Sequence, residues 1–133
     1  MWYDRADMKL SALFLVGVGG FFGAIARFAV ATFAAHRWGD SFPWGTFIIN
    51  ITGCFMIATF LTIAAGFHLH EGWRYVFPIG FVGAYTTFST YEYETMRLID
   101  AGAWPRAVAY VLSSTIVGLA AVYFGAWIVR RFS

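Results

Sequence analysis

The chain has 133 residues, of which 60% are hydrophobic and only 12% are charged, so it has too little polar surface to coat a small soluble domain. Its net charge of +2 comes from basic residues scattered at the ends of apolar stretches, and these form no stripe of the kind that binds nucleic acid. The single cysteine, Cys54, excludes a disulfide framework and a cysteine-based metal cluster.

Four apolar stretches follow one another along the chain, separated by short segments that carry Gly and polar residues. A helix needs about 20 apolar residues to cross a bilayer, and each stretch is close to that length or longer. We therefore expect an all-α membrane protein, with residues 1–133 forming a single four-helix transmembrane domain. The expected spans are at about residues 10–35, 43–67, 75–98 and 106–130.

The basic residues are almost evenly divided between the two faces of this arrangement. One face receives five and the other receives four: Arg5, Lys9, Arg74, Arg130 and Arg131 against Arg27, Arg37, Arg97 and Arg106. The positive-inside rule therefore gives almost no preferred orientation. Such a chain could insert both ways, and two oppositely oriented copies could form an antiparallel dimer.

Small residues recur at four-residue spacing in the first and fourth spans. The pairs are Gly19 with Gly23, Ser114 with Gly118, and Ala121 with Gly125. This spacing lets helices approach closely, either within the chain or between two copies.

The first two spans contain one charged residue, Arg27, and one side-chain amide, Asn50. Arg27 either extends to the headgroups from the end of a long first helix or belongs to an anion vestibule. Asn50 lies one turn after Thr46 on the same helix face. Its amide either bonds to a neighbouring helix or presents N–H donors to an anion.

The third span contains GAYTTFSTYEYE, residues 83–94, which is unusually rich in hydroxyl groups for a membrane segment. Gly80 and Gly83 precede clustered threonines, and together they predict a helix that breaks near the middle of the membrane. A broken helix exposes carbonyls that can coordinate a small cation, together with free N–H groups. The alternative is an intact helix in which each hydroxyl bonds to a carbonyl of its own helix.

Beyond the expected break, Phe88 and Tyr91 share one helix face, and Thr87, Thr90 and Glu94 form an adjoining polar stripe. Aromatic ring edges carry partial positive charge and can attract a small anion, although packing is the more common role of such rings. Glu94 is expected near the point where the helix meets water.

Four motifs, one for each span, resemble the small four-helix fluoride channels of the Fluc or CrcB family: GGFFGAIARF (19–28), WGTFIINITGCF (44–55), GFVGAYTTFSTYEYE (80–94) and AYVLSS (109–114). Members of that family are antiparallel, dual-topology homodimers with two fluoride pores. The resemblance implies a passive, fluoride-selective channel, with no enzymatic activity, that exports cytoplasmic fluoride across the bacterial inner membrane. The implied partners are fluoride, a second copy of the chain and the lipid bilayer, with no nucleic acid.

The resemblance also assigns residues. It implies that the backbone carbonyls of Gly83 and Thr86, from both subunits, hold one structural Na⁺ at the dimer axis. Phe88 matches the first phenylalanine of the family's pore, and Tyr91 stands where the family usually has the second. The remaining positions implied by the comparison are pore-lining Asn50, Thr46, Tyr110, Ser114, Thr87 and Thr90, with Arg27 and Glu94 at the pore mouths.

The main alternative is a proton-coupled small multidrug-type transporter, which is also a dimer of four-helix chains. It needs a carboxylate embedded in the membrane, preferably in the first span, and that span has none. A membrane scaffold without transport would need neither a break nor an ordered polar track. An enzyme is not expected, because the three histidines lie in loops and no pairing of a nucleophile with a base is visible.

Overall fold

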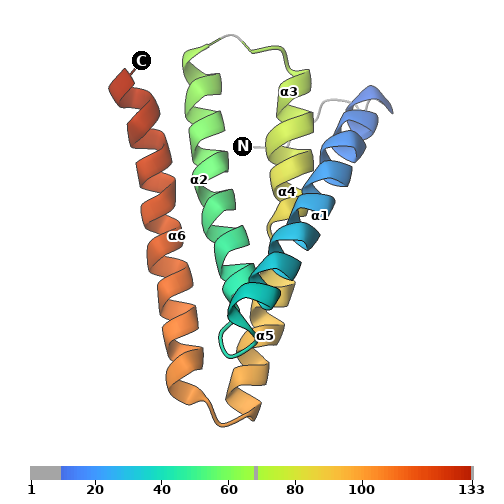
Figure 1. Ribbon diagram of the computed structural model, residues 1–133. Helices are drawn as coiled ribbons and strands as arrows, with labels where there is room; N and C mark the ends of the chain where they lie inside the picture. Colours follow the sequence, from blue (N-terminus) through green and yellow to red (C-terminus); the bar gives the residue numbers. More distant parts are fainter. Residues whose placement is uncertain (1–9, 68, 133) are drawn as a thin grey trace.

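The computed structural model describes residues 10–67 and 69–132, and all the regular structure within them is helical. Arg5 and Lys9, whose charges entered the comparison of the two faces, lie outside this part of the chain. His68, one of the three histidines, also lies outside it. There are four rods, and each runs antiparallel to the one before it in the chain (Figure 1). They are α1 (Leu10–Trp38), α2 (Trp44–Gly66), a third rod made of several pieces, and α6 (Trp104–Phe132). The all-α class is therefore confirmed.

The third rod is interrupted. It consists of α3 (Gly72–Arg74), the π-helix η1 (Tyr75–Val82), α4 (Gly83–Tyr85) and α5 (Phe88–Asp100). Within the described residues, α1, α2 and α6 are each long and apolar enough to cross a membrane. The pieces of the third rod are individually too short to meet that criterion.

Pro78 explains the wide turn of η1. The rod begins at Gly72, and Pro78 lies inside η1. Proline has no N–H, so it cannot make the usual bond to the carbonyl four residues earlier, and its ring crowds that carbonyl. A local change to π-helical spacing accommodates both effects.

Glycines let α1 lie directly against η1. A Cβ on Gly19 would clash with the main chain of Val76, and one on Gly23 would clash with the main chain of Phe81. Even a Cβ on Gly80 would lie only 2.7 Å from the Val16 carbonyl oxygen. The first predicted pair of small residues therefore forms a contact within the chain.

The fourth span packs mainly on α2. A Cβ on Gly125 would lie 2.8 Å from both the Phe55 carbonyl oxygen and Thr59 Oγ1. Gly118 faces Cys54 and Ile51, which also belong to α2. The small residues of α6 therefore also have neighbours inside the chain, so their spacing is no longer an argument for contact between copies.

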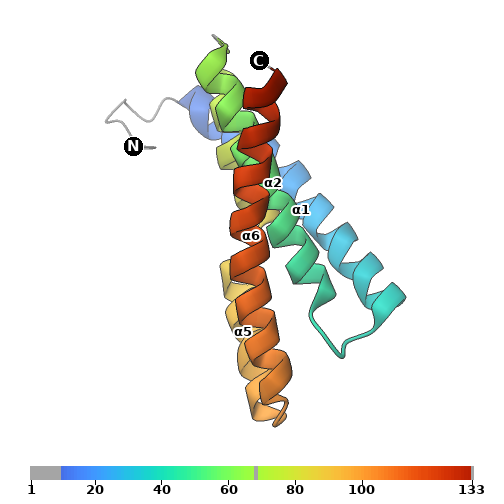
Figure 2. The same cartoon turned by 90° about the vertical axis from the view of Figure 1, so that its left-hand side faces the viewer.

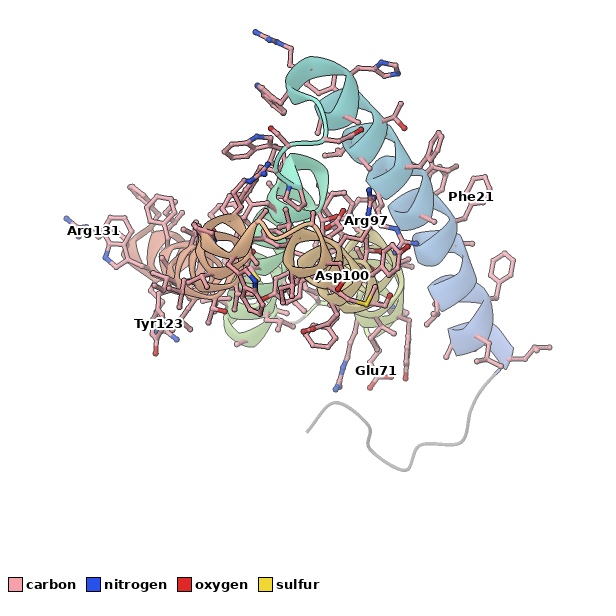
Figure 3. All side chains as sticks on the ribbon, turned by 90° about the horizontal axis from the view of Figure 1, so that it is seen from below. Phe21, Glu71, Arg97, Asp100, Tyr123 and Arg131 are labelled. Atoms are coloured by element: carbon pink, nitrogen blue, oxygen red, sulfur yellow. The ribbon has the colours of Figure 1, made fainter. Side chains whose placement is uncertain are left out.

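Large apolar side chains cover the outside of the bundle. Phe14, Phe21 and Phe28 of α1 are 70%, 62% and 74% exposed, and Phe21 points away from the other rods (Figure 3). An outward apolar face of this kind needs lipid or another protein surface.

Two short connections lie at the same end of the bundle, residues 39–43 between α1 and α2 and residues 101–103 between α5 and α6 (Figure 1). Gly39 and Gly102 have φ angles of 69° and 70°, a left-handed conformation that glycine adopts without strain. Arg106 Nη1 donates a hydrogen bond of 2.9 Å to the Ser41 carbonyl oxygen, which links the start of α6 to the first connection. Seen from the side, α1 diverges from the other rods towards this end (Figure 2).

Candidate functional site

The third rod is broken at Thr86 and Thr87. Both residues have extended backbone, with φ and ψ of −77° and 158° at Thr86 and of −150° and 118° at Thr87. The break is therefore present, but Gly83 itself is helical, with φ −61° and ψ −36°. The expectation that glycines open the helix was wrong in this respect, because Gly80 serves the close contact with α1 and the threonines carry the extended backbone.

The threonine hydroxyls stabilise the two helix ends that the break creates. The Thr86 hydroxyl donates to the Val82 carbonyl at 2.9 Å, which completes the last turn before the break. Thr87 caps α5, since its Oγ1 accepts a hydrogen bond from the Thr90 N–H at 3.3 Å. The Thr87 hydroxyl donates in turn to Thr90 Oγ1 at 3.0 Å.

Asn50 of α2 fills the gap that the break leaves in the backbone hydrogen bonding. The Thr87 N–H donates to Asn50 Oδ1 at 2.9 Å, and Asn50 Nδ2 donates to the Thr87 carbonyl at 3.0 Å. The alternative of an amide bonded to a neighbouring helix is therefore realised. A primary amide has two N–H donors, so one donor of Asn50 remains beyond this pair.

These bonds redirect the partners of the two carbonyls assigned to a cation. In an uninterrupted α-helix the Gly83 carbonyl accepts from the Thr87 N–H, and the Thr86 carbonyl accepts from the Thr90 N–H. Here the Thr87 N–H goes to Asn50 and the Thr90 N–H goes to the Thr87 side chain. Both carbonyl oxygens therefore keep acceptor capacity, which suits a hard cation.

A second cluster surrounds Glu94, in the half of the rod that follows the break. Thr46 Oγ1 donates to Glu94 Oε1 at 2.9 Å, and Tyr110 Oη donates to Glu94 Oε2 at 2.8 Å. Thr46 and Tyr110 are only 4% and 0% exposed. Glu94, which was expected near the water boundary, thus also contacts two of the predicted pore-lining residues.

Aromatic rings form a continuous file alongside this cluster. The ring centroids of Phe88 and Tyr91 lie 5.9 Å apart, those of Tyr91 and Tyr110 5.1 Å apart, and those of Tyr110 and Phe42 5.3 Å apart. Phe88 is 73% exposed on the single chain. One wall of any pore next to Phe88 would therefore come from outside this chain.

The remaining predicted residues lie on either side of these clusters. Ser114 is one turn after Tyr110 on α6, and its buried Oγ has no hydrogen-bond partner among the described residues. Arg27 is half-buried on α1, one turn beyond Gly23 and so on the face that meets the third rod. In residues 10–67 and 69–132 no side-chain hydrogen bond of Arg27 is seen.

A cavity of about 400 Å³ opens at the end of the bundle that carries the two short connections. Its walls come from the end of α1, the start of α2, the end of α5 and the start of α6. Thr46 and Glu94 belong to this lining, so the cavity reaches the Glu94 cluster from outside.

Sequence reasoning missed several residues that shape the site. Gly53 of α2 lets Thr86 pack close to the helix, because a Cβ there would clash with the Thr86 side chain. Tyr85, which is 5% exposed, shares a hydrogen bond of 2.9 Å with Thr52. Phe42 extends the aromatic file. Gly53 and Tyr85 lie inside two of the motifs quoted from the sequence, so the family resemblance of those motifs could have indicated them.

Comparison with known proteins gives a consistent result. A family model described as CrcB-like protein, Camphor Resistance (CrcB), matches residues 14–126. A relative from Acidobacterium capsulatum named fluoride-specific ion channel FluC is 49% identical over 111 residues, which cover 83% of this chain and 89% of the relative. Relatives with the same name from Koribacter versatilis and Solibacter usitatus are 42% and 40% identical, covering 92% and 88% of this chain and 98% and 97% of the relatives.

The chain thus belongs to the CrcB family of ion channels, a multi-pass membrane protein family. Its relatives are named as channels and not as enzymes, in agreement with the expectation that no reaction is catalysed. The family resemblance drawn from the four motifs is confirmed.

Proposed function

We propose that the chain forms a passive, fluoride-selective channel that exports cytoplasmic fluoride across the bacterial inner membrane. The observation that carries this proposal is the 49% identity, over most of both chains, to a relative named as a fluoride-specific channel. The matched relatives are bacterial, which supports the location.

The arrangement of the site supports transport of a small anion. Asn50 keeps one N–H donor beyond its bonds to Thr87. The Ser114 hydroxyl, which has no partner among residues 10–67 and 69–132, provides a further donor. The edges of Phe88 and Tyr91 add partial positive charge without a fixed cation that would trap the ion. Ion selectivity by hydrogen-bond donors in a narrow passage requires no chemical turnover.

An antiparallel homodimer with two pores completes the proposal. Phe88 is largely exposed on the single chain, and α1 presents a row of outward phenylalanines. A second copy would cover both features and supply the missing pore wall. The even distribution of basic residues over the two faces favours dual topology, which an antiparallel pair requires.

The proposed cofactor is one structural Na⁺ at the dimer axis, held by the Gly83 and Thr86 carbonyls. The main-chain oxygens fit a hard cation, and the described residues contain no cluster of acidic, histidine or cysteine side chains that would hold a metal instead. Hard cations such as Ca²⁺ and Mg²⁺ take about six or more oxygen ligands, and two carbonyls are well short of that number. Equivalent carbonyls of a second copy would bring the shell closer to completion, and a bound cation would then fix the two broken rods to each other.

Glu94 gives the proton-coupled transporter its strongest support. Its carboxylate is half-buried and accepts hydrogen bonds from Thr46 and Tyr110 within the bundle. Coupled exchange would require this carboxylate to gain and lose protons during transport. The named relatives favour the channel over this alternative.

The proposed function is tested by releasing anions from vesicles that contain the purified protein. Vesicles loaded with fluoride should empty rapidly when a potassium ionophore dissipates the membrane potential, and vesicles loaded with chloride should not. Release of both anions at the same rate, or of neither, would refute fluoride selectivity.

A further inference from the structure

The cavity at the end of the bundle is lined by two arginines as well as by Glu94 and Thr46. Arg97 belongs to the last turn of α5, and Arg106 lies in the first turn of α6. From below, Arg97 lies between α5 and α1 (Figure 3), and both of these helices contribute residues to the cavity lining. The two guanidinium groups therefore border the same space from two different helices.

Neither arginine is neutralised by a close ion pair within the described residues. Arg106 donates to the main-chain oxygen of Ser41, which holds its side chain in place without cancelling its charge. Arg97 lies one turn after Glu94 and acts electrostatically on that carboxylate from beyond hydrogen-bond distance. Guanidinium groups stay charged at all physiological pH values.

The cavity also has two negative groups in its lining, and their positions differ. Glu94 lies at the inner end, where two hydroxyl donors share its charge. Asp40 lies in the exposed connection between α1 and α2. An anion that enters from solution would thus meet Arg97 and Arg106 before the carboxylate of Glu94.

We propose that this cavity is an anion-collecting vestibule, in which Arg97 and Arg106 attract fluoride from solution and offset the charge of Glu94 on the way to the pore. This inference rests on the proposed function, since it names the residues that bring the ion to that same site. Clefts whose walls carry one sign of charge raise the local concentration of counter-ions by about 10- to 1,000-fold in favourable cases. This lining also contains Asp40 and Glu94, so we expect the effect of the two arginines at the lower end of that range. The effect must weaken as salt screens the charges.

The experiment measures initial rates of fluoride efflux from vesicles at two ionic strengths, about 0.01 M and about 1 M, set with an impermeant salt. The corresponding Debye lengths are about 30 Å and about 3 Å, so long-range attraction acts in the first condition and is screened in the second. The variants are Arg97→Gln, Arg106→Gln, the charge-retaining Arg97→Lys, and Asp40→Asn. Arg37→Gln is the matched control, because Arg37 is exposed near the same end of the bundle but outside the cavity lining.

At low ionic strength, Arg97→Gln and Arg106→Gln should each lower the rate by about two- to tenfold, which is at the lower end of known focusing effects. Arg97→Lys should stay close to the unmodified protein, and Asp40→Asn should raise the rate. Arg37→Gln should lower the rate by less than either cavity variant, because its charge lies outside the walls that focus the field. The differences should disappear at about 1 M salt.

Two outcomes would overturn the vestibule. In the first, the Arg97→Gln and Arg106→Gln rates equal the Arg37→Gln rate at low salt. In the second, the two variants lose the same fraction of the efflux rate at high salt as at low salt, which indicates a structural role. Failure of the unmodified protein to release fluoride would instead refute the proposed function, so the two ideas fail in different ways.

Discussion

Asn50 of α2 and Thr87 of the interrupted rod exchange two hydrogen bonds, from the Thr87 N–H to Oδ1 at 2.9 Å and from Nδ2 to the Thr87 carbonyl at 3.0 Å. One side-chain amide thereby satisfies both main-chain groups of a residue that has left the helix. A buried N–H or carbonyl without a partner costs about 1–3 kcal/mol, so this pair is what makes an interruption tolerable inside a bundle. The break therefore depends on α2 as much as on its own threonines.

Changing Asn50→Asp should abolish fluoride efflux. A carboxylate still accepts from the Thr87 N–H, but it has no donor for the Thr87 carbonyl and adds a negative charge where an anion should pass. Loss of that bond leaves the Thr87 carbonyl without its partner, which destabilises the break by about 1–3 kcal/mol, and the added charge repels the anion. Efflux from vesicles measures the result, with gel filtration to check assembly.

Thr62→Val is a suitable control for the Asn50 variant, because the Thr62 hydroxyl donates only to the Ala58 carbonyl of its own helix. It should retain efflux. Undiminished efflux in Asn50→Asp would remove Asn50 from the pore.

Changing Phe88→Ile should abolish efflux without unfolding the chain. Phe88 is 73% exposed and packs on Tyr91 only at the edge of the bundle, so its loss should change the stability of the single chain by about 0.5 kcal/mol or less. The branched aliphatic side chain removes the ring edge that attracts the anion. Phe132→Ile, at an 85% exposed position on α6, should leave efflux unchanged. Normal efflux in Phe88→Ile would show that the ring does not border the ion path.

Changing Gly23→Ala should destabilise the bundle. The added methyl group would meet the main chain of Phe81, which cannot move aside as a flexible side chain can. Overpacking of this kind costs about 1–3 kcal/mol and should lower the unfolding temperature in detergent by several degrees. Gly17→Ala is the control on the same helix, because a Cβ there has no atom within 4 Å. Equal unfolding temperatures for the two variants would contradict the close contact between α1 and η1.

The sequence was most informative where a motif carries local chemistry. The hydroxyl-rich segment predicted a break, and the structure places it at Thr86 and Thr87. Apolar lengths placed the four rods to within three residues of their observed ends. Both features follow from properties of neighbouring residues, namely hydropathy and side-chain capping.

Contacts between distant segments could not be predicted in the same way. Nothing local indicates that Asn50 pairs with Thr87, 37 positions later, or that Glu94 receives hydrogen bonds from Thr46 and Tyr110. The spacing of Gly19 and Gly23 shows a face that permits close approach, but it does not identify the partner. The partner is η1 of the same chain, and that depends on how the rods pack.

The cation assignment predicts sodium that remains bound through purification. Protein prepared in sodium buffer and dialysed against sodium-free potassium buffer should retain about one Na⁺ per dimer, as measured by atomic emission, because four backbone carbonyls from two copies would enclose the ion. Complete loss of sodium with an intact dimer would contradict an enclosed structural site. A high-resolution structure with water between the Gly83 and Thr86 carbonyls would do the same.

The reversal potential of the current in a bilayer that contains the protein is the most direct test of passive fluoride conduction. With fluoride at different concentrations on the two sides and chloride and pH equal, the current should reverse at the equilibrium potential of fluoride and should not shift when a pH gradient is imposed. A reversal potential that follows chloride, or that moves with the proton gradient, would contradict a fluoride-selective channel.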